Sequence, residues 1–354
     1  MTINYLLVFV PAALALDWYD ANPLLIFLAA AVAVVPLSDL IGQSTEDLGT
    51  KLGETLGGML NATMGNLPEM IIGIFALRKG LQTVVKASLT GSILGNILFI
   101  LGLAIIAGGM RRPTLHYNIN LAGVNSKLLL LAAIGLIVPA LANYASSGLE
   151  DKIGVEIAVI LFAAYLASLA FTLVTHKRLF QTRQPEGPME GERQTRAAGW
   201  ASLILAVAAG LLAAVSETLT GALEPTAKQL HLTPVFAGIF LLATVGNASG
   251  LINAVRFARR NKMDLALSIT LGAAAQAALL VAPVLVLSSY LVGHPMDLLF
   301  SQFEVVAISL AVVIGRTMTA DGESSWVEGV MLVAVYAMLG VGFFYLRPTT
   351  GHMG

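Results

Sequence analysis

The chain has 354 residues, of which 57% are hydrophobic and only 12% are charged, and its formal net charge is −1. A soluble domain carries about twice this charged fraction, so the composition excludes an ordinary soluble protein and indicates a polytopic membrane protein. The chain contains no cysteine, which excludes disulfides, thiolate metal sites and cysteine nucleophiles. The balanced charge, with no basic tract, also predicts no nucleic-acid partner.

Hydrophobic stretches of helical length predict about eleven transmembrane helices. In chain order they lie near residues 4–17, 23–43, 53–77, 82–108, 125–145, 152–175, 197–221, 233–257, 264–289, 299–316 and 326–346. The predicted fold class is therefore an all-α polytopic protein embedded in the lipid bilayer.

A polar segment divides these helices into two groups of five. It contains Gln184-Pro185-Glu186-Gly187-Pro188 and several charges, a composition typical of a flexible linker. The predicted organisation is an N-terminal transmembrane helix (1–22), a first five-helix repeat (23–175), a polar cytoplasmic linker (176–196), and a second five-helix repeat with a short tail (197–354).

The two groups resemble each other in sequence. Gly65-Asn66 is followed three residues later by Glu69, and Gly246-Asn247 is followed at the same spacing by Gly250. An odd number of helices per repeat makes the second copy enter the membrane from the opposite side. This inverted-repeat topology predicts a substrate site near the midplane, between the two copies.

Most of the 20 Lys and Arg residues fall in loops on the same side as the N-terminus. Basic loops favour the cytoplasmic side of a membrane. We expect an integral protein of a prokaryotic inner (plasma) membrane, with the N-terminus in the cytoplasm and the C-terminus outside.

Glu69 is the leading candidate for the cation- and proton-binding group. A carboxylate within a membrane span is costly, so its presence indicates a functional site. Gly65 and Pro68 weaken the helix beside it and predict a kink that exposes backbone carbonyl groups. The alternative is a protonated glutamate that is hydrogen-bonded within the core.

Two amides and two further carboxylates are secondary candidates. The side-chain oxygens of Asn66 and Asn247 offer neutral cation ligands, or else these residues hydrogen-bond between helices. Glu46 and Glu217 occupy equivalent positions in the two repeats, where they gather cations, take part in proton transfer, or only cap and pack. We find no phosphate-binding glycine loop, zinc motif or nucleophile–base pair, so an enzyme is not expected.

Several motifs resemble those of one family, the Ca²⁺/H⁺ antiporters of the cation/Ca²⁺ exchanger superfamily. These motifs occupy residues 57–69, 86–96, 261–265, 281–285, 296–298 and 321–329. The resemblance implies a first helix plus two inverted five-helix repeats, and exchange of Ca²⁺ for protons by alternating access. It implies no cofactor besides the transported Ca²⁺ and H⁺, and it predicts no oligomeric state.

The resemblance also assigns roles to residues of this chain. The implied cation and proton site comprises Glu69, Asn66, Asn247, Gly65 and Gly246, with Glu69 as the metal ligand. The implied lining residues are Ser92, Asn96, Gln276, Ser249 and Gly250, and the implied peripheral acids are Glu46 and Glu217.

The second motif departs from the family pattern. The family has Gly-Asn-Ala-Ala-Glu-His where this chain has Gly246-Asn-Ala-Ser-Gly-Leu251, and Gly-Ser-Ser where it has Gly272-Ala-Ala. Ca²⁺ prefers six to eight oxygens and usually more than one carboxylate. Two alternatives to Ca²⁺/H⁺ exchange therefore stay open: a Na⁺ or K⁺/H⁺ exchanger that uses Glu69 alone, and a non-transporting sensor or scaffold.

Overall fold

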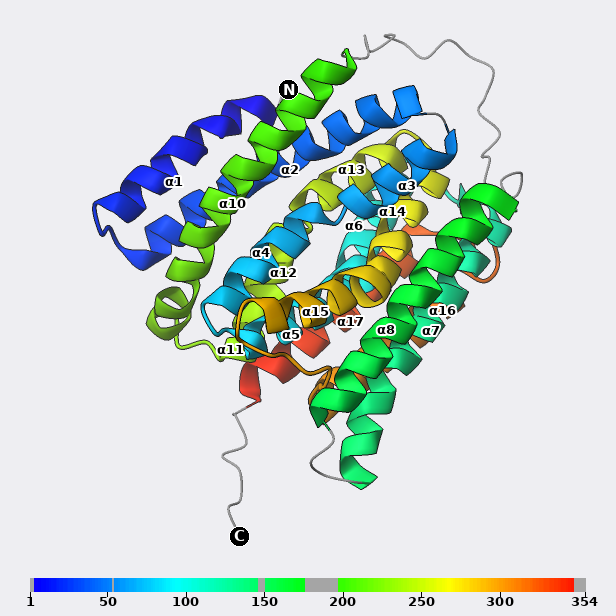
Figure 1. The fold of residues 1–354 in the computed structure, drawn as a ribbon. Coiled ribbons are helices and arrows are strands. Elements are labelled where there is room, and N and C mark those ends of the chain that lie inside the picture. Colours follow the sequence, from blue (N-terminus) through cyan, green and yellow to red (C-terminus); the bar gives the residue numbers. More distant parts are fainter. Residues whose placement is uncertain (1–2, 53, 146–149, 176–196, 347–354) are drawn as a thin grey trace.

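The computed structural model describes residues 3–52, 54–145, 150–175 and 197–346, and it is helical almost throughout (Figure 1). The first half contains η1 (Ile3–Val8), α1 (Phe9–Trp18), α2 (Pro23–Leu52), α3 (Glu54–Met64), α4 (Leu67–Arg78), α5 (Gln82–Leu94), η2 (Gly95–Ile100), α6 (Leu101–Gly109), α7 (Ile119–Ala145), α8 (Glu150–Ala170) and η3 (Phe171–Thr175). The predicted linker 176–196 and residues 347–354 of the predicted tail lie outside the described residues.

The second half repeats this order of long and broken helices. It contains α10 (Ala198–Gln229), α11 (Pro234–Phe236), η4 (Ala237–Leu242), α12 (Ala243–Gly246), α13 (Ala248–Arg259), α14 (Met263–Gln276), η5 (Ala277–Val281), α15 (Ala282–Leu291), α16 (Gln302–Met318) and α17 (Trp326–Tyr345). A two-residue antiparallel pair, β1 (Leu115–His116) with β2 (Glu323–Ser324), joins the loop after α6 to the loop before α17.

The all-α membrane class is confirmed. Seven helices of the described chain are long and apolar enough to cross a membrane, and an eighth span results if one bent pair is counted as a single crossing. The predicted number of eleven is not confirmed by these criteria and stays a prediction. Helices α2 and α10 extend beyond their predicted ends because polar residues continue the helix after the hydrophobic stretch.

Corresponding helices of the two halves are broken at their Gly-Asn segments. Gly65 and Asn66 separate α3 from α4, and Asn247 separates α12 from α13 with a bend of 59°. Pro68 lies in the first turn of α4, where its missing N–H costs no helical hydrogen bond. The predicted kink before Glu69 is therefore present. Next to each break, a π-helical segment (η2 or η5) interrupts the following span, a feature that often marks functional sites.

Two glycines allow close packing between the halves. A side chain on Gly91 of α5 would collide with the backbone of Ile239 in η4, and one on Gly238 would collide with that of Val84. Small residues at such crossings are typical of membrane helices. This close approach brings the polar residues of α5 beside those of α12.

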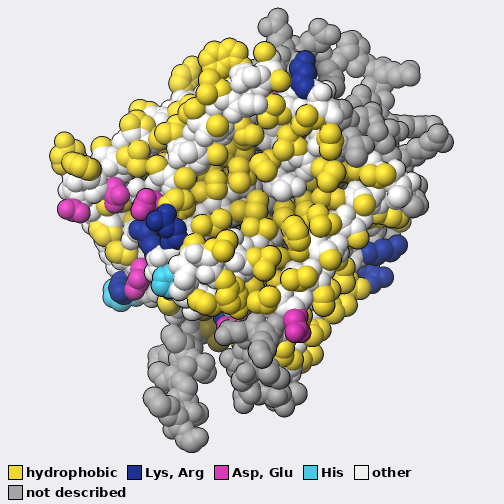
Figure 2. Space-filling model, in the orientation of Figure 1, with side chains coloured by type: hydrophobic (Ala, Val, Ile, Leu, Met, Phe, Trp, Pro, Cys, Tyr) yellow, Lys and Arg dark blue, Asp and Glu magenta, His cyan; other side chains and the backbone are white. Residues whose placement is uncertain are grey.

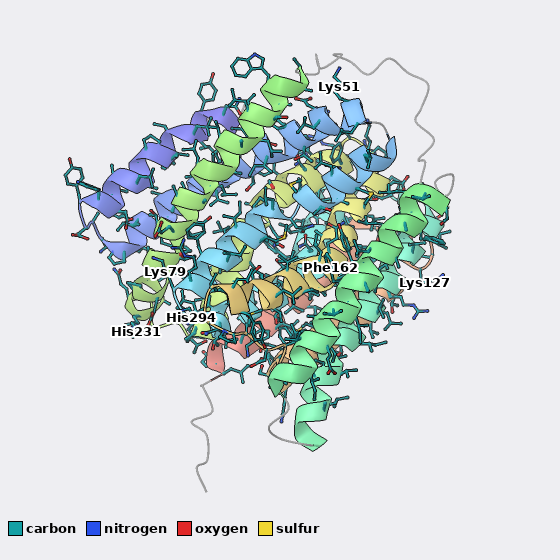
Figure 3. All side chains as sticks on the ribbon, viewed as in Figure 1. Lys51, Lys79, Lys127, Phe162, His231 and His294 are labelled. Atoms are coloured by element: carbon teal, nitrogen blue, oxygen red, sulfur yellow. The ribbon has the colours of Figure 1, made fainter. Side chains whose placement is uncertain are left out.

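Polar and apolar side chains are segregated along the molecule. Figure 2 shows hydrophobic side chains over most of the visible surface between the two ends, as expected for a surface in contact with lipid. Figure 3 shows Lys51 at one end, and Lys79, His231 and His294 together near the opposite end. We call these ends the Lys51 side and the His231 side.

Candidate functional site

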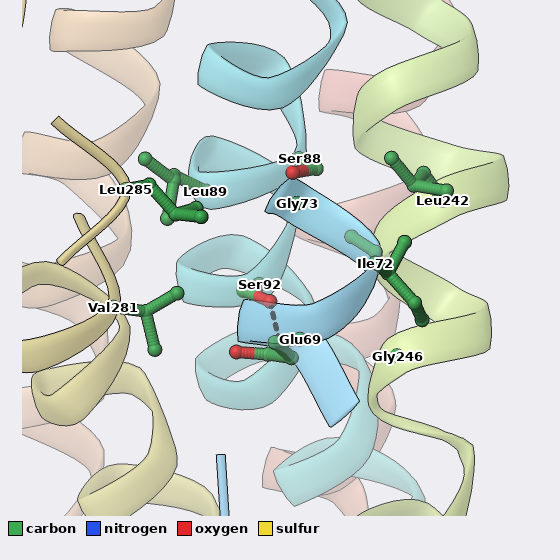
Figure 4. Close-up of a pocket in the computed structure, with 11 residues that line it drawn as sticks. Glu69, Ile72, Gly73, Ser88, Leu89, Ser92, Leu242, Gly246, Val281 and Leu285 are labelled. Carbon is green, nitrogen blue, oxygen red and sulfur yellow. Dashed lines mark hydrogen bonds between the residues drawn. The ribbon is translucent and has the colours of Figure 1, made fainter. Parts of the chain in front are cut away.

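Glu69 lies in the first turn of α4, directly after the break in the helix. The start of a helix carries a partial positive charge, which favours a carboxylate there. The Ser92 hydroxyl of α5 donates a hydrogen bond of 2.5 Å to Glu69 Oε1 (Figure 4). Local helix geometry and one cross-helix bond thus fix the position of this carboxylate.

The second half of the chain supports Ser92 through Asn247. Asn247 Nδ2 donates to Ser92 Oγ at 2.7 Å and to the Ala243 carbonyl at 2.9 Å. Asn247 Oδ1 in turn accepts from Asn96 Nδ2 at 2.8 Å. Glu69 is therefore held by a hydrogen-bond network that runs from Asn96 through Asn247 to Ser92, and so crosses between the halves.

A second pair of amide side chains, Asn66 and Gln276, also joins the two halves. Asn66 Nδ2, from the first break, donates to Gln276 Oε1 at 2.5 Å, at the end of α14. Asn66 is only 4% exposed, and its Oδ1 accepts no hydrogen bond from the described part of the chain. Because Asn66 lines a large cavity, this carbonyl oxygen is available to a cation there.

A cavity of about 700 Å³ extends from Glu69 toward the Lys51 side. Its direction follows from the helices that line it. Helix α2 lines the cavity as far as Glu46, about two turns before its end at Leu52. Helices α13 and α14 line it at Arg256 and Leu265, which flank the loop that joins these two helices. The predicted site residues that line it are Glu46, Gly65, Asn66, Glu69, Asn96, Gly246, Asn247, Ser249, Gly250 and Gln276.

On the opposite face of Glu69, toward the His231 side, the space is much smaller. A pocket of about 20 Å³, enough for one water molecule, lies there. Figure 4 shows Glu69 and Ser92 at one end of this pocket and the apolar side chains of Leu89, Leu242 and Leu285 around it. Glu69 is therefore accessible from one side of the protein and shielded from the other.

The two glycines of the second motif have different surroundings. A Cβ added at Gly246 would lie 3.2 Å from Glu69 Cγ, so this position must stay small. A Cβ added at Gly250 would have Ile269 Cγ2 at 3.9 Å as its nearest neighbour. Gly250 thus leaves open space in the cavity where the resemblance implies a carboxylate.

The structure brings together most, but not all, of the predicted candidates. Glu46 is exposed within the cavity, whereas Glu217 is exposed on α10 and does not line it. Within the described residues, no three His, Asp or Glu side chains gather in a metal-binding arrangement. Glu69 is thus the central carboxylate of the described cavity.

Seven further polar residues that the sequence did not mark as site residues line the cavity. They are Ser38, Asp39, Gln43, Asn61, Asn253, Arg256 and Ser268. Asp39 lies inside the predicted span 23–43, so the rule that identified Glu69, a carboxylate at membrane depth, also applies to it. For the other six, only the packing of the bundle determines that they face the cavity.

Comparison with known proteins gives full-length matches. The sodium/calcium exchanger protein family matches residues 22–174 and 200–345. The chain is 38% identical to the Ca(2+)/H(+) antiporter of Synechocystis sp., over 97% of both chains. It is also 38% identical to the Ca(2+)/H(+) antiporter ChaA of Bacillus subtilis, over 91% of this chain and 92% of that one.

Solved structures share the architecture. The structure of native YfkE matches with a TM-score of 0.84 and 32% identity, over 97% of this chain and 100% of the YfkE chain. The H+/Ca2+ exchanger CAX has the same fold, with a TM-score of 0.75, 14% identity, and coverage of 97% of this chain and 91% of its own. The family match spans most of the chain, and a relative more than 30% identical is covered almost completely. The chain belongs to the sodium/calcium exchanger family.

Proposed function

We propose that this protein is a secondary active antiporter that exchanges Ca²⁺ for H⁺ at a midplane site centred on Glu69. The observation that carries the proposal is the position of Glu69, between a large cavity lined by many polar side chains and a small pocket with mostly apolar walls. The names of the full-length relatives, Ca(2+)/H(+) antiporters, support Ca²⁺ as the cation.

In this mechanism Glu69 binds either a cation or a proton, so that each excludes the other. Glu69 supplies the charge, Asn66 supplies its available side-chain oxygen, and the backbone carbonyls around Gly65 and Gly246 are further hard ligands of the kind that Ca²⁺ prefers. Ser92 holds the carboxylate in place whichever species is bound.

Transport requires that the accessible side alternates. The state described here opens to the Lys51 side, and the apolar residues around the small pocket separate Glu69 from the His231 side. The second state closes the large cavity and opens the path past Leu242 and Leu285. We place the Lys51 side in the cytoplasm, because the loops there carry most of the basic residues.

The experiment is cation-driven proton movement in proteoliposomes, with Ca²⁺, Na⁺ and K⁺ tested separately. We expect Ca²⁺ to drive proton movement, Glu69→Gln to abolish it, and the matched control Glu217→Gln to preserve it, since Glu217 lies outside the described cavity.

Two other results would contradict the proposal. Proton movement with Na⁺ or K⁺ but not Ca²⁺ would indicate a monovalent exchanger, which the missing carboxylate at Gly250 favours. No proton movement with any of the three cations, in protein that remains folded, would indicate a sensor or scaffold.

A further inference from the structure

The missing carboxylate at Gly250 raises a problem of charge. Ca²⁺ bound by Glu69 alone leaves a net positive charge in a low-dielectric region, which disfavours binding. The second half-site presents Gly250, Asn253 and Arg256 along one face of α13, and none of them is negative. If the protein binds Ca²⁺, a second negative charge must come from another helix.

Asp39 has the position that such a charge requires. It lies near the middle of α2, a helix of 30 residues, and lines the same cavity as Glu69 and Asn66. Glu46 is seven residues farther along α2, about 10 Å nearer the Lys51 side. Asp39 is thus deep in the cavity, whereas Glu46 is exposed closer to its mouth.

The contacts of Asp39 leave its charge unbalanced. Its Oδ2 accepts a hydrogen bond of 2.6 Å from Gln43 Nε2, one turn along the same helix. No described Lys, Arg or His forms an ion pair with it. A partly buried carboxylate at this depth, held only by a neutral amide, is costly unless it faces water or a cation.

The other charged groups lining the described cavity are Glu46, Glu69 and Arg256. With Asp39 they make three carboxylates against one guanidinium, so the cavity stays negative overall. Asn66 is only 4% exposed and lines the same cavity, and its Oδ1 accepts no described hydrogen bond, which is an independent sign that this space takes a cation. Asp39 is therefore the candidate for the second negative charge.

We propose that Asp39 is the second cation-binding carboxylate of the cavity and supplies the charge that Gly250 lacks. This inference rests on the proposed Ca²⁺/H⁺ exchange. With Glu69 and Asp39 both lining the cavity, their two negative charges balance one bound Ca²⁺. Without Asp39, Ca²⁺ bound at Glu69 leaves a net positive charge at membrane depth, which disfavours binding.

The experiment measures KM for Ca²⁺ in Ca²⁺-driven proton movement in proteoliposomes, for wild type, Asp39→Asn, Gly250→Glu and the double variant. Asp39→Asn keeps the shape of the side chain and an oxygen that accepts from Gln43. We expect it to raise KM for Ca²⁺ by about tenfold or more, because the bound cation then has one carboxylate fewer. Glu217→Gln, outside the described cavity, should leave KM unchanged.

The second part of the experiment places a carboxylate at position 250. Because Gly250 faces open space, we expect Gly250→Glu in the Asp39→Asn background to restore the KM. Asp39→Asn with unchanged KM would overturn the inference. A raised KM that Gly250→Glu does not restore would also overturn it, since Asp39 would then only position other groups.

Failure of the proposed function is distinguishable from failure of this inference. If wild type shows no Ca²⁺-driven proton movement, exchange is refuted, and Ca²⁺-induced stabilisation in detergent tests Asp39 alone. A rise in Tm with Ca²⁺ that Asp39→Asn abolishes would support the second carboxylate. An equal rise in both proteins, or no rise in wild type, would overturn it.

Discussion

Ser92 is the residue on which the geometry of Glu69 depends most directly. Its hydroxyl donates to Glu69 and accepts from Asn247, so one oxygen atom joins the carboxylate to the second half of the chain. Replacing it would leave the carboxylate without this donor and the Asn247 amide without its acceptor.

We expect Ser92→Ala to lower Ca²⁺-driven proton movement by roughly tenfold or more, because a hydrogen bond to a charged group contributes about 1.5–3 kcal/mol. The matched control is Ser88→Ala, one turn earlier on α5, where the hydroxyl bonds only to the nearby Val85 carbonyl. Equal rates for wild type and Ser92→Ala would show that Glu69 is positioned by other contacts.

The two glycines of the second motif give a matched pair of substitutions. Gly246→Ala should impair exchange strongly, since its Cβ would lie 3.2 Å from Glu69 Cγ and displace the carboxylate. Gly250→Ala should be tolerated, because its nearest contact would be ordinary at 3.9 Å. Rates of Ca²⁺-driven proton movement in proteoliposomes check both, and the reverse order would contradict the described arrangement.

At the scale of helices, the crossing of α5 over η4 holds the site together. We expect Gly91→Ala to lower the free energy of unfolding by about 1–3 kcal/mol, since its methyl group would overlap the backbone of Ile239. Gly95→Ala, four residues later on the same span, has nothing within 4 Å and serves as the control. Thermal unfolding in detergent measures the difference, and similar Tm values for the two variants would argue against this crossing.

The breaks in the helices were predictable, while their partners were not. Glycine weakens a helix and proline removes a backbone N–H wherever they occur. The kink before Glu69 therefore follows from the presence of Gly65 and Pro68 in the sequence. The bond between Asn66 and Gln276 joins residues 210 positions apart and depends on how the whole bundle packs. Sequence therefore predicts where a helix breaks, but not what lies opposite.

The length of α2 shows a second limit of sequence reasoning. Hydropathy predicts an end near residue 43, but the helix continues to Leu52. Gln43 and Glu46, in its last turns, line the cavity. Because helical residues that face a cavity can be polar, hydropathy does not detect this part of the helix. Asp39, by contrast, carries the same sequence signal as Glu69, a carboxylate within a predicted span.

At the scale of the whole molecule, access to Glu69 is one-sided, and this can be measured by chemical labelling. The chain has no cysteine, so single cysteines can be introduced without a background reaction. Ser268 lines the large cavity and Ser88 lines the small pocket. We expect Ser268→Cys to react with a membrane-impermeant thiol reagent from the Lys51 side only, and Ser88→Cys to be protected in this state.

The labelling experiment also reports on the second state. Conditions that favour the opposite state should protect Ser268→Cys and expose Ser88→Cys to reagent from the His231 side. If both positions react from the same side under every condition, then Glu69 does not alternate between two sides.

The groups that brace the site across the two halves share one chemical property. The bonds from Asn96 to Asn247, from Asn247 to Ser92 and from Asn66 to Gln276 are made by amides and a hydroxyl, none of which gains or loses a proton at physiological pH. In the proposed exchange, the frame around Glu69 therefore keeps the same donors and acceptors whether the site holds a proton or a cation. Exchanging one for the other then changes the charge of the carboxylate without rebuilding its surroundings, which keeps the reorganisation energy of each cycle small.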